Sequence, residues 1–84
     1  MDFCMVEFHD NQNGINSDLQ IPLSLTGNDL VTALATAYKL PIDLNNPDDM
    51  YLRGEDPIML ISGDETLEEL GMSNGTRIYF DPRH

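Results

Sequence analysis

The sequence contains a single cysteine, no tryptophan and only four basic residues. One cysteine excludes an intrachain disulfide and any zinc site built from several cysteines. The four basic residues stand against 15 acidic ones, which gives a net charge of -11. Proteins that bind nucleic acid or an anionic membrane surface carry a basic footprint instead. Both of these partner classes are therefore disfavoured.

Long hydrophobic stretches are also missing. The longest apolar run, Pro57 to Ile61, is far shorter than the ~20 residues that a membrane-spanning helix needs. The chain opens on Met1, Asp2 and Phe3, without the basic start and apolar core of a signal peptide. We therefore expect a cytoplasmic protein with no membrane insertion.

The chain has enough apolar material for one small domain. Its 84 residues are 40% hydrophobic, which suffices for a core but leaves no room for a second domain. We expect a single domain over residues 1–84, with the last four residues forming a short tail.

The opening residues predict a β-hairpin. Residues 3–9 alternate as in a half-buried strand, and Asn13-Gly14 is a hairpin turn signal. A second alternating segment covers 18–25 and contains Pro22, which cannot donate to a ladder and so predicts a sheet edge. The two inward sets are Cys4, Val6 and Phe8, and Leu19, Ile21, Leu23 and Leu25.

A helix follows the hairpin. Thr26 and Asp29 have the spacing of a capping box, and Pro41 ends the helical pattern. Ile42 and Leu44, in the loop that follows, are expected to tuck under the helix. The apolar residues at helical spacing are Leu30, Val31, Ala33, Leu34, Ala37 and Tyr38.

The second half predicts three short strands and a helical turn. Residues 50–53 and 58–61 have strand patterns, and the last strand covers 76–80. Thr66 opens a second capping box, and Gly71 is placed to close that turn with a left-handed cap.

The order of elements indicates an α+β fold. A hairpin, a crossover helix and returning strands make a mixed sheet of four to five strands, with one helix across one face and a short helical turn before the last strand. The first and last strands of such a sheet lie centrally and parallel. This arrangement is the β-grasp, or ubiquitin-like roll.

The second half also carries a family resemblance. The segments are MYLRG (50–54), PIML (57–60), ETLEELGM (65–72) and NGTRIYF (74–80). In this order they resemble the ubiquitin-like superfamily, and within it the chain is most similar to the bacterial YukD/EsaB family. Those are stand-alone ubiquitin-like proteins of Gram-positive bacteria, encoded with type VII secretion systems that export small WXG-type proteins. The resemblance implies a cytosolic accessory or regulatory component, with no catalysis.

One feature of ubiquitin-type modifiers and β-grasp sulfur carriers is absent. Those proteins end in a flexible Gly-Gly tail whose carboxylate is activated by adenylation. This chain ends in FDPRH, and Lys39 is its single lysine. Conjugation and sulfur transfer are therefore disfavoured.

The outer face of the predicted sheet is the candidate partner-binding site. If the even-numbered side chains of the first strand face the helix, the opposite face carries two tyrosines and two of the four basic residues. Tyr, Met and Arg are enriched at protein interfaces, so we expect a non-acidic binding patch there. Ordinary cross-strand pairing on a solvated face is the alternative. The patch comprises Phe3, Met5, Tyr51, Arg53, Arg77 and Tyr79.

The acidic residues of the second half have two interpretations. They either dock a basic partner or keep a small domain soluble, and the second is favoured. Calcium binding at Asp43, Asp48 and Asp49 is disfavoured because the sequence lacks the loop motif that sets calcium geometry.

No catalytic, cofactor or metal site emerges from the sequence. Cys4 lies on the inward set and is expected in the core. His9 and His84 are isolated and lack a ligand pattern. We therefore expect a non-enzymatic protein-binding module with no cofactor. An accessory subunit of a multi-component enzyme is the alternative, a sulfur carrier or modifier is the less favoured one, and the sequence assigns no oligomeric state.

Overall fold

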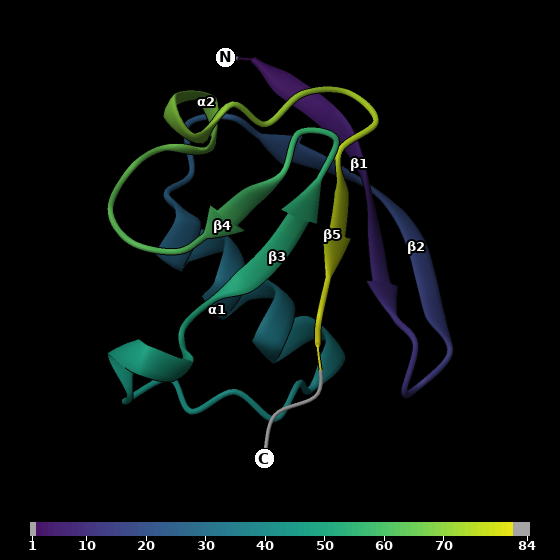
Figure 1. Ribbon diagram of the computed structural model, residues 1–84, viewed down its shortest axis with the longest axis vertical. Coiled ribbons are helices and arrows are strands. Elements are labelled where there is room, and N and C mark those ends of the chain that lie inside the picture. Colours follow the sequence, from purple (N-terminus) through teal and green to yellow (C-terminus); the bar gives the residue numbers. More distant parts are fainter. Residues whose placement is uncertain (1, 82–84) are drawn as a thin grey trace.

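The computed structural model describes residues 2–81; Met1 and residues 82–84, which belong to the predicted tail, lie outside the described part of the chain. Figure 1 shows the elements in chain order. They are β1 (Phe3–Asp10), β2 (Ile15–Pro22), α1 (Gly27–Tyr38), the 3₁₀ helix η1 (Pro47–Asp49), β3 (Leu52–Glu55), β4 (Met59–Ile61), α2 (Leu67–Leu70) and β5 (Arg77–Tyr79).

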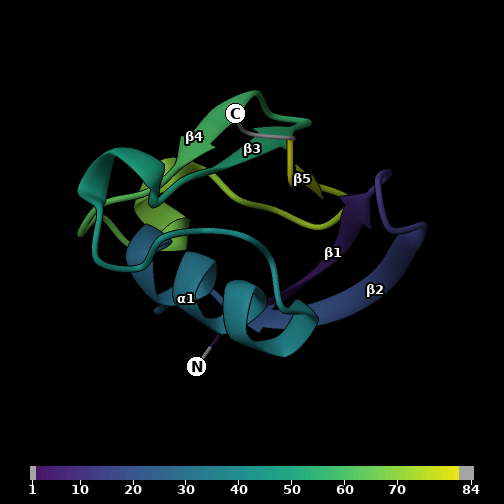
Figure 2. The same cartoon turned by 90° about the horizontal axis from the view of Figure 1, so that it is seen from below.

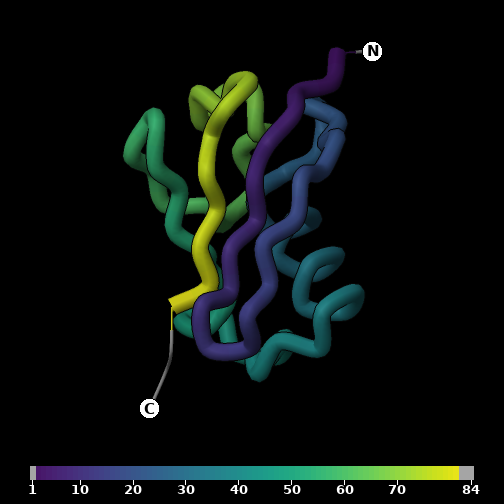
Figure 3. Tube along the Cα trace, turned by 90° about the vertical axis from the view of Figure 1, so that its right-hand side faces the viewer, coloured from purple at the N-terminus to yellow at the C-terminus, as the bar shows by residue number. Residues whose placement is uncertain are grey.

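The five strands form one mixed sheet in the order β2-β1-β5-β3-β4. The central strands β1 and β5 are parallel, and Figure 3 shows them side by side with β2 along the edge. Figure 2 shows α1 lying across one face of the curved sheet. The predicted β-grasp fold is confirmed, including its central parallel pair and the edge position of the strand that contains Pro22.

The first hairpin is tighter than the sequence predicted, because β2 begins at Ile15 and ends at Pro22 rather than covering 18–25. The turn is closed by the buried Asp10 carboxylate, which accepts hydrogen bonds from the Gln12 backbone and the Asn13 side chain. Residues 23–25 do not continue the pairing of β2 with β1, because the carbonyls of Leu23 and Leu25 accept hydrogen bonds from backbone N–H groups of α2. The Leu25 oxygen accepts from the Leu67 N–H at 2.8 Å.

Helix α1 begins as predicted. The Asp29 N–H donates to the Thr26 hydroxyl and the Thr26 N–H to the Asp29 carboxylate, each at 3.1 Å. The buried stripe differs in part, since Ala35 lies in the core while Ala33 and Ala37 are exposed. The stripe repeats every three or four residues from Gly27, and a helix turns the two exposed alanines away from it. The buried side chains are Leu30, Val31, Leu34 and Ala35.

The connection after α1 corrects a second expectation. Ile42 is buried as predicted, but Leu44 is 43% exposed and is not tucked under the helix. The third strand is predicted at 50–53 but begins two residues later and extends to Glu55. The Met50 and Tyr51 N–H groups bond carbonyls within η1, so β3 begins at Leu52.

The β3–β4 hairpin is closely packed at Gly54, which has no side chain. Gly54 lies in β3 rather than in the turn, and a Cβ there would be 2.6 Å from the Met59 side chain. In the segment that follows, the Thr66 capping box and the left-handed Gly71 cap (φ 92°) are confirmed. Strand β5, at Arg77–Tyr79, is shorter than predicted.

The core lies between α1 and the sheet. Full burial of each aliphatic or aromatic side chain contributes about 1.5–3 kcal/mol. Cys4 belongs to this core as predicted, and burial raises the pKa of its thiol. The largest fully buried side chains are Phe8, Leu30, Leu52, Ile61, Leu67 and Ile78.

Candidate interaction surface

Five of the six predicted patch residues lie in strands of the sheet and Tyr51 lies just before β3, and the six do not form one cluster. Phe3 and Met5 are 48% and 50% exposed at the start of β1. They lie beside the turn before β5, where the Met5 carbonyl accepts from Gly75. Tyr51, just before β3, and Arg53, Arg77 and Tyr79 are partly exposed. Arg53, Arg77 and Tyr79 are close neighbours through the β3–β5 ladder.

Four side chains form a continuous row across the outer face, and we call it the aromatic–arginine row. Strand register aligns its members on β1, β5, β3 and β4. The rings of His9 and Tyr79 stack with centroids 5.0 Å apart, and the Arg53 guanidinium lies 4.4 Å from the Tyr79 ring centroid. The row ends in an exposed aliphatic side chain. Its members are His9, Tyr79, Arg53 and Leu60.

Arg53 is fixed by two carboxylates. Its Nε and a terminal nitrogen donate to the two oxygens of Asp81 at 2.7 and 3.0 Å, and its other terminal nitrogen donates to Glu55. The hydrogen bonds to Asp81, followed by the attraction of both carboxylates, raise the pKa of Arg53. A guanidinium held by this fork has one preferred orientation, so it holds Tyr79 in place.

A second row of charged side chains runs beside the first. Arg77 on β5 lies between Glu7 on β1 and Glu55 on β3. Its guanidinium is 2.6 Å from the Asp56 carboxylate and 3.4 Å from that of Glu55. The negative charge of Asp56 is the main cause that raises the pKa of Arg77. The Arg77 Nε atom is enclosed and has no acceptor among residues 2–81.

These ion pairs correct the expectation of a non-acidic patch. Three carboxylates bond the two arginines, and Glu7 adds a further negative charge in the same row. These pairings were not predicted, because Glu55 was not assigned to a strand and Asp81 was placed in the tail. The signal for Leu60 was the alternation of side chains along the fourth strand. Its neighbour Ile61 faces the core, so Leu60 faces outward.

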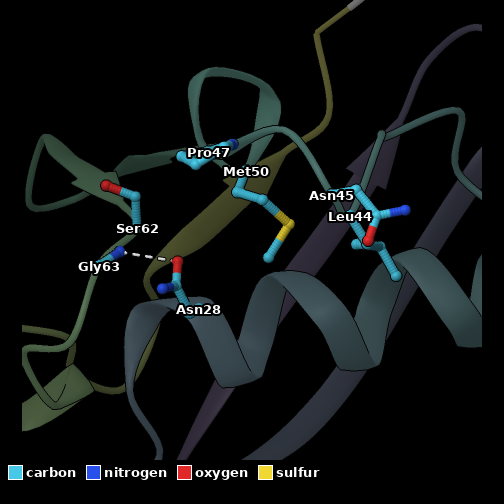
Figure 4. A pocket seen from close by; sticks show the side chains of 7 residues that line it. All are labelled: Asn28, Leu44, Asn45, Pro47, Met50, Ser62 and Gly63. Atoms are coloured by element: carbon cyan, nitrogen blue, oxygen red, sulfur yellow. Dashed lines mark hydrogen bonds between the residues drawn. The ribbon is translucent and has the colours of Figure 1, made fainter.

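A shallow groove of about 360 Å³ opens on another side of the molecule. Figure 4 shows Met50 reaching over the first turns of α1, with the Asn28 amide bonded to Gly63. That bond joins the Asn28 Oδ1 to the Gly63 N–H at 2.9 Å. Leu44 and Pro47 complete the apolar part of the groove. The described residues that line the groove include no ionisable side chain.

The acidic loop before β3 uses its carboxylates to hold its own backbone. Asp49 accepts from the Asp43 N–H at 2.6 Å, and Asp43 accepts from the Asn45 N–H at 2.9 Å. Within residues 2–81 there is no group of three or more His, Cys, Asp or Glu side chains placed to hold a metal. The same residues include no helix long and apolar enough to cross a bilayer.

Comparison with known proteins finds likeness in structure alone. No family model and no curated protein sequence matches the chain. Among solved structures, the ubiquitin-like domain of tubulin-binding cofactor B is 22% identical with a TM-score of 0.72, over 93% of this chain and 87% of that one.

Two further solved structures broaden the comparison. Ubiquitin of Caldiarchaeum subterraneum is 21% identical with a TM-score of 0.61, over 93% and 90% of the two chains. A chain of the toluene 4-monooxygenase HD complex is 13% identical with a TM-score of 0.63, over 95% and 100%. At these identities the likeness establishes a ubiquitin-like β-grasp fold.

Proposed function

We propose that this chain is a non-enzymatic protein-interaction module that binds its partner through the outer sheet face. We propose further that it is cytoplasmic and serves a bacterial type VII secretion system as an accessory or regulatory component. The observation that carries the binding role is the aromatic–arginine row, which is built on a rigid sheet and faces away from the core. The resemblance to YukD/EsaB proteins is the reason for choosing the secretion system.

The row has the properties of a preorganised contact surface. Tyr79 lies between His9 and Arg53, which come from the strands on either side of β5. Arg53 is itself held by Asp81. A side chain that is fixed before binding loses less entropy when the complex forms. Leu60 adds an apolar side chain that is 60% exposed, and buried aliphatic and aromatic anchors provide much of the energy of protein interfaces.

The binding role is tested by capturing partners from the native cell. We expect the double variant Tyr51→Ser, Tyr79→Ser to lose a partner that the wild-type chain retains. Leu60→Ser should weaken the same capture, and its exposed position makes it a variant that folds. Leu44→Ser is the matched control, because Leu44 is comparably exposed but lines the groove of Figure 4. Capture that is unchanged by the first two variants, with unfolding temperatures showing intact folds, rejects the sheet face.

The secretion role needs a separate experiment. Deletion of the gene should reduce export of the small WXG-type proteins, and the wild-type gene should restore it. The double tyrosine variant, expressed at the same level, should not. Export that continues normally in the deletion strain rejects this assignment and leaves the binding role intact.

An accessory subunit of a multi-component enzyme is the second candidate. The observation that favours it is the fold shared with a chain of the toluene 4-monooxygenase HD complex. Under this alternative, the captured partner is a catalytic subunit rather than a secretion component. Mass spectrometry of the captured proteins distinguishes the two.

A further inference from the structure

We infer that the partner of the outer sheet face is cationic, with lysine or arginine side chains placed around an aliphatic one. This inference rests on the proposed function and specifies the chemistry of the partner. It differs from what two exposed arginines suggest at first, which is a surface for carboxylates.

Both arginines already have carboxylate partners within the chain. Asp81 occupies two nitrogens of Arg53, and Glu55 occupies the third. Arg77 bonds Asp56, and its Nε is enclosed. A carboxylate arriving from a partner would meet the negative charge of these acids, which opposes its binding.

The carboxylates of this face outnumber the arginines they bond. Each carboxylate has about four lone-pair sites, so the acids retain capacity to accept further hydrogen bonds. Asp56 is 72% exposed. Glu7, whose Oε1 lies 3.1 Å from the His9 Nε2, and its cross-strand neighbour Asp18 add negative charge beside Arg77. A cationic partner therefore meets an excess of negative charge along this row, with Asp56 the most exposed of the acids that bond the arginines.

The aromatic–arginine row has an apolar end. Leu60 is exposed at the point where the row reaches the edge strand β4. Since Tyr79 has His9 on one side and Arg53 on the other, the partner meets Leu60 as the open apolar contact of the row. The charge of -11 on the whole chain increases the rate at which a cationic partner arrives.

Two synthetic peptides of equal apolar content provide the probe, one with lysines around a central leucine and one with glutamates in their place. Each is titrated into the isotope-labelled chain and followed by amide chemical shifts. We expect the lysine peptide to perturb β1, β3, β4 and β5 around Leu60 and Arg53, and the glutamate peptide to perturb nothing. Perturbation spread evenly over α2 and the 43–49 loop would instead indicate a general attraction of charge, and it overturns the inference.

A matched pair of variants separates contact from general attraction. Glu7→Gln and Glu65→Gln each remove one negative charge, but only Glu7 lies on the outer face. We expect Glu7→Gln to weaken lysine-peptide binding by about two- to fivefold, as for one exposed ion pair, and Glu65→Gln to weaken it less. Equal losses overturn the inference.

The result is independent of the capture experiment on the tyrosines. If the tyrosine variants lose their partner but the glutamate peptide binds better, the face is an interaction site and the cationic assignment alone is wrong. If neither peptide binds the face and the capture is unchanged, the proposed function itself has failed.

Discussion

Gly27→Ala should destabilise the fold even though alanine is the better helix former. Gly27 is the first residue of α1 and is buried. A Cβ at this position would lie 2.4 Å from the Ser62 carbonyl oxygen and 2.6 Å from the Ser62 nitrogen. These are backbone atoms, and the segment that holds them is fixed because Gly27 N–H bonds the Glu65 carbonyl and Asn28 N–H bonds the Gly63 carbonyl.

The magnitude follows from two opposing effects. Overpacking a rigid site costs about 1–3 kcal/mol, whereas replacing glycine by alanine in a helix gains at most about 1 kcal/mol. Taking the middle of each range, the expected net loss is about 1–2 kcal/mol. For a domain of this size that lowers the unfolding temperature by about 5–15 °C.

Thermal unfolding followed by far-ultraviolet circular dichroism measures this, since the chain has no tryptophan to report by fluorescence. Gly14 is the control, because its φ is +69° and a Cβ added there would meet no atom within 4 Å. Asparagine tolerates that left-handed conformation, so Gly14→Asn should be mild while Gly27→Asn should be as harmful as Gly27→Ala. A Gly27→Ala protein as stable as the wild type would refute the reasoning.

Two further predictions concern charged groups. Arg53→Lys removes the two-bond fork to Asp81 and the contact with a tyrosine ring, so urea unfolding should show a decrease of about 1 kcal/mol in the free energy of unfolding. Arg77→Lys is the control, because it keeps its charge and loses no bond from Nε. A larger decrease for Arg77→Lys than for Arg53→Lys contradicts the structural role given to Arg53. Hydrogen bonds from the backbone N–H and hydroxyl of its cap residue lower the pKa of Glu69 from its ordinary 4.5. The resulting stabilisation is complete above about pH 4.5 and disappears as the pH falls through the lower folded-state pKa. The unfolding temperatures of wild type and Glu69→Gln should therefore converge in acid. Glu68→Gln, which removes a neighbouring carboxylate, is the control and should show no such convergence. Equal behaviour of the two variants rules out the capping effect.

Local signals explain why the sequence predicted much of the fold. The boxes that open at Thr26 and Thr66 depend on residues three apart, and a left-handed cap needs only a glycine such as Gly71 at the right place. These features are decided within a few residues, so they can be recognised without knowing the tertiary structure. The alternation of the first strand has the same local character.

The ladder and the charged face depend on distant residues and could not be read in the same way. The fork joins Arg53 to Asp81, which are 28 residues apart, and nothing near either residue indicates the pairing. The start of β3 likewise depends on η1, whose carbonyls bond Met50 and Tyr51 first. Arg53, Arg77 and Tyr79 are neighbours on one face, as expected. The expectation that this face is non-acidic was wrong, because carboxylates bond both arginines.

The central place of β5 has a consequence for synthesis of the protein. The β1–β2 and β3–β4 hairpins emerge from the ribosome before the strand that lies between them. Until Arg77–Tyr79 is free of the exit tunnel, no strand connects β1 to β3. Phe8 on β1 and Leu52 on β3 are then not covered by β5. In the nascent chain the two hairpins therefore remain separate, and the five-stranded sheet forms only after β5 has emerged.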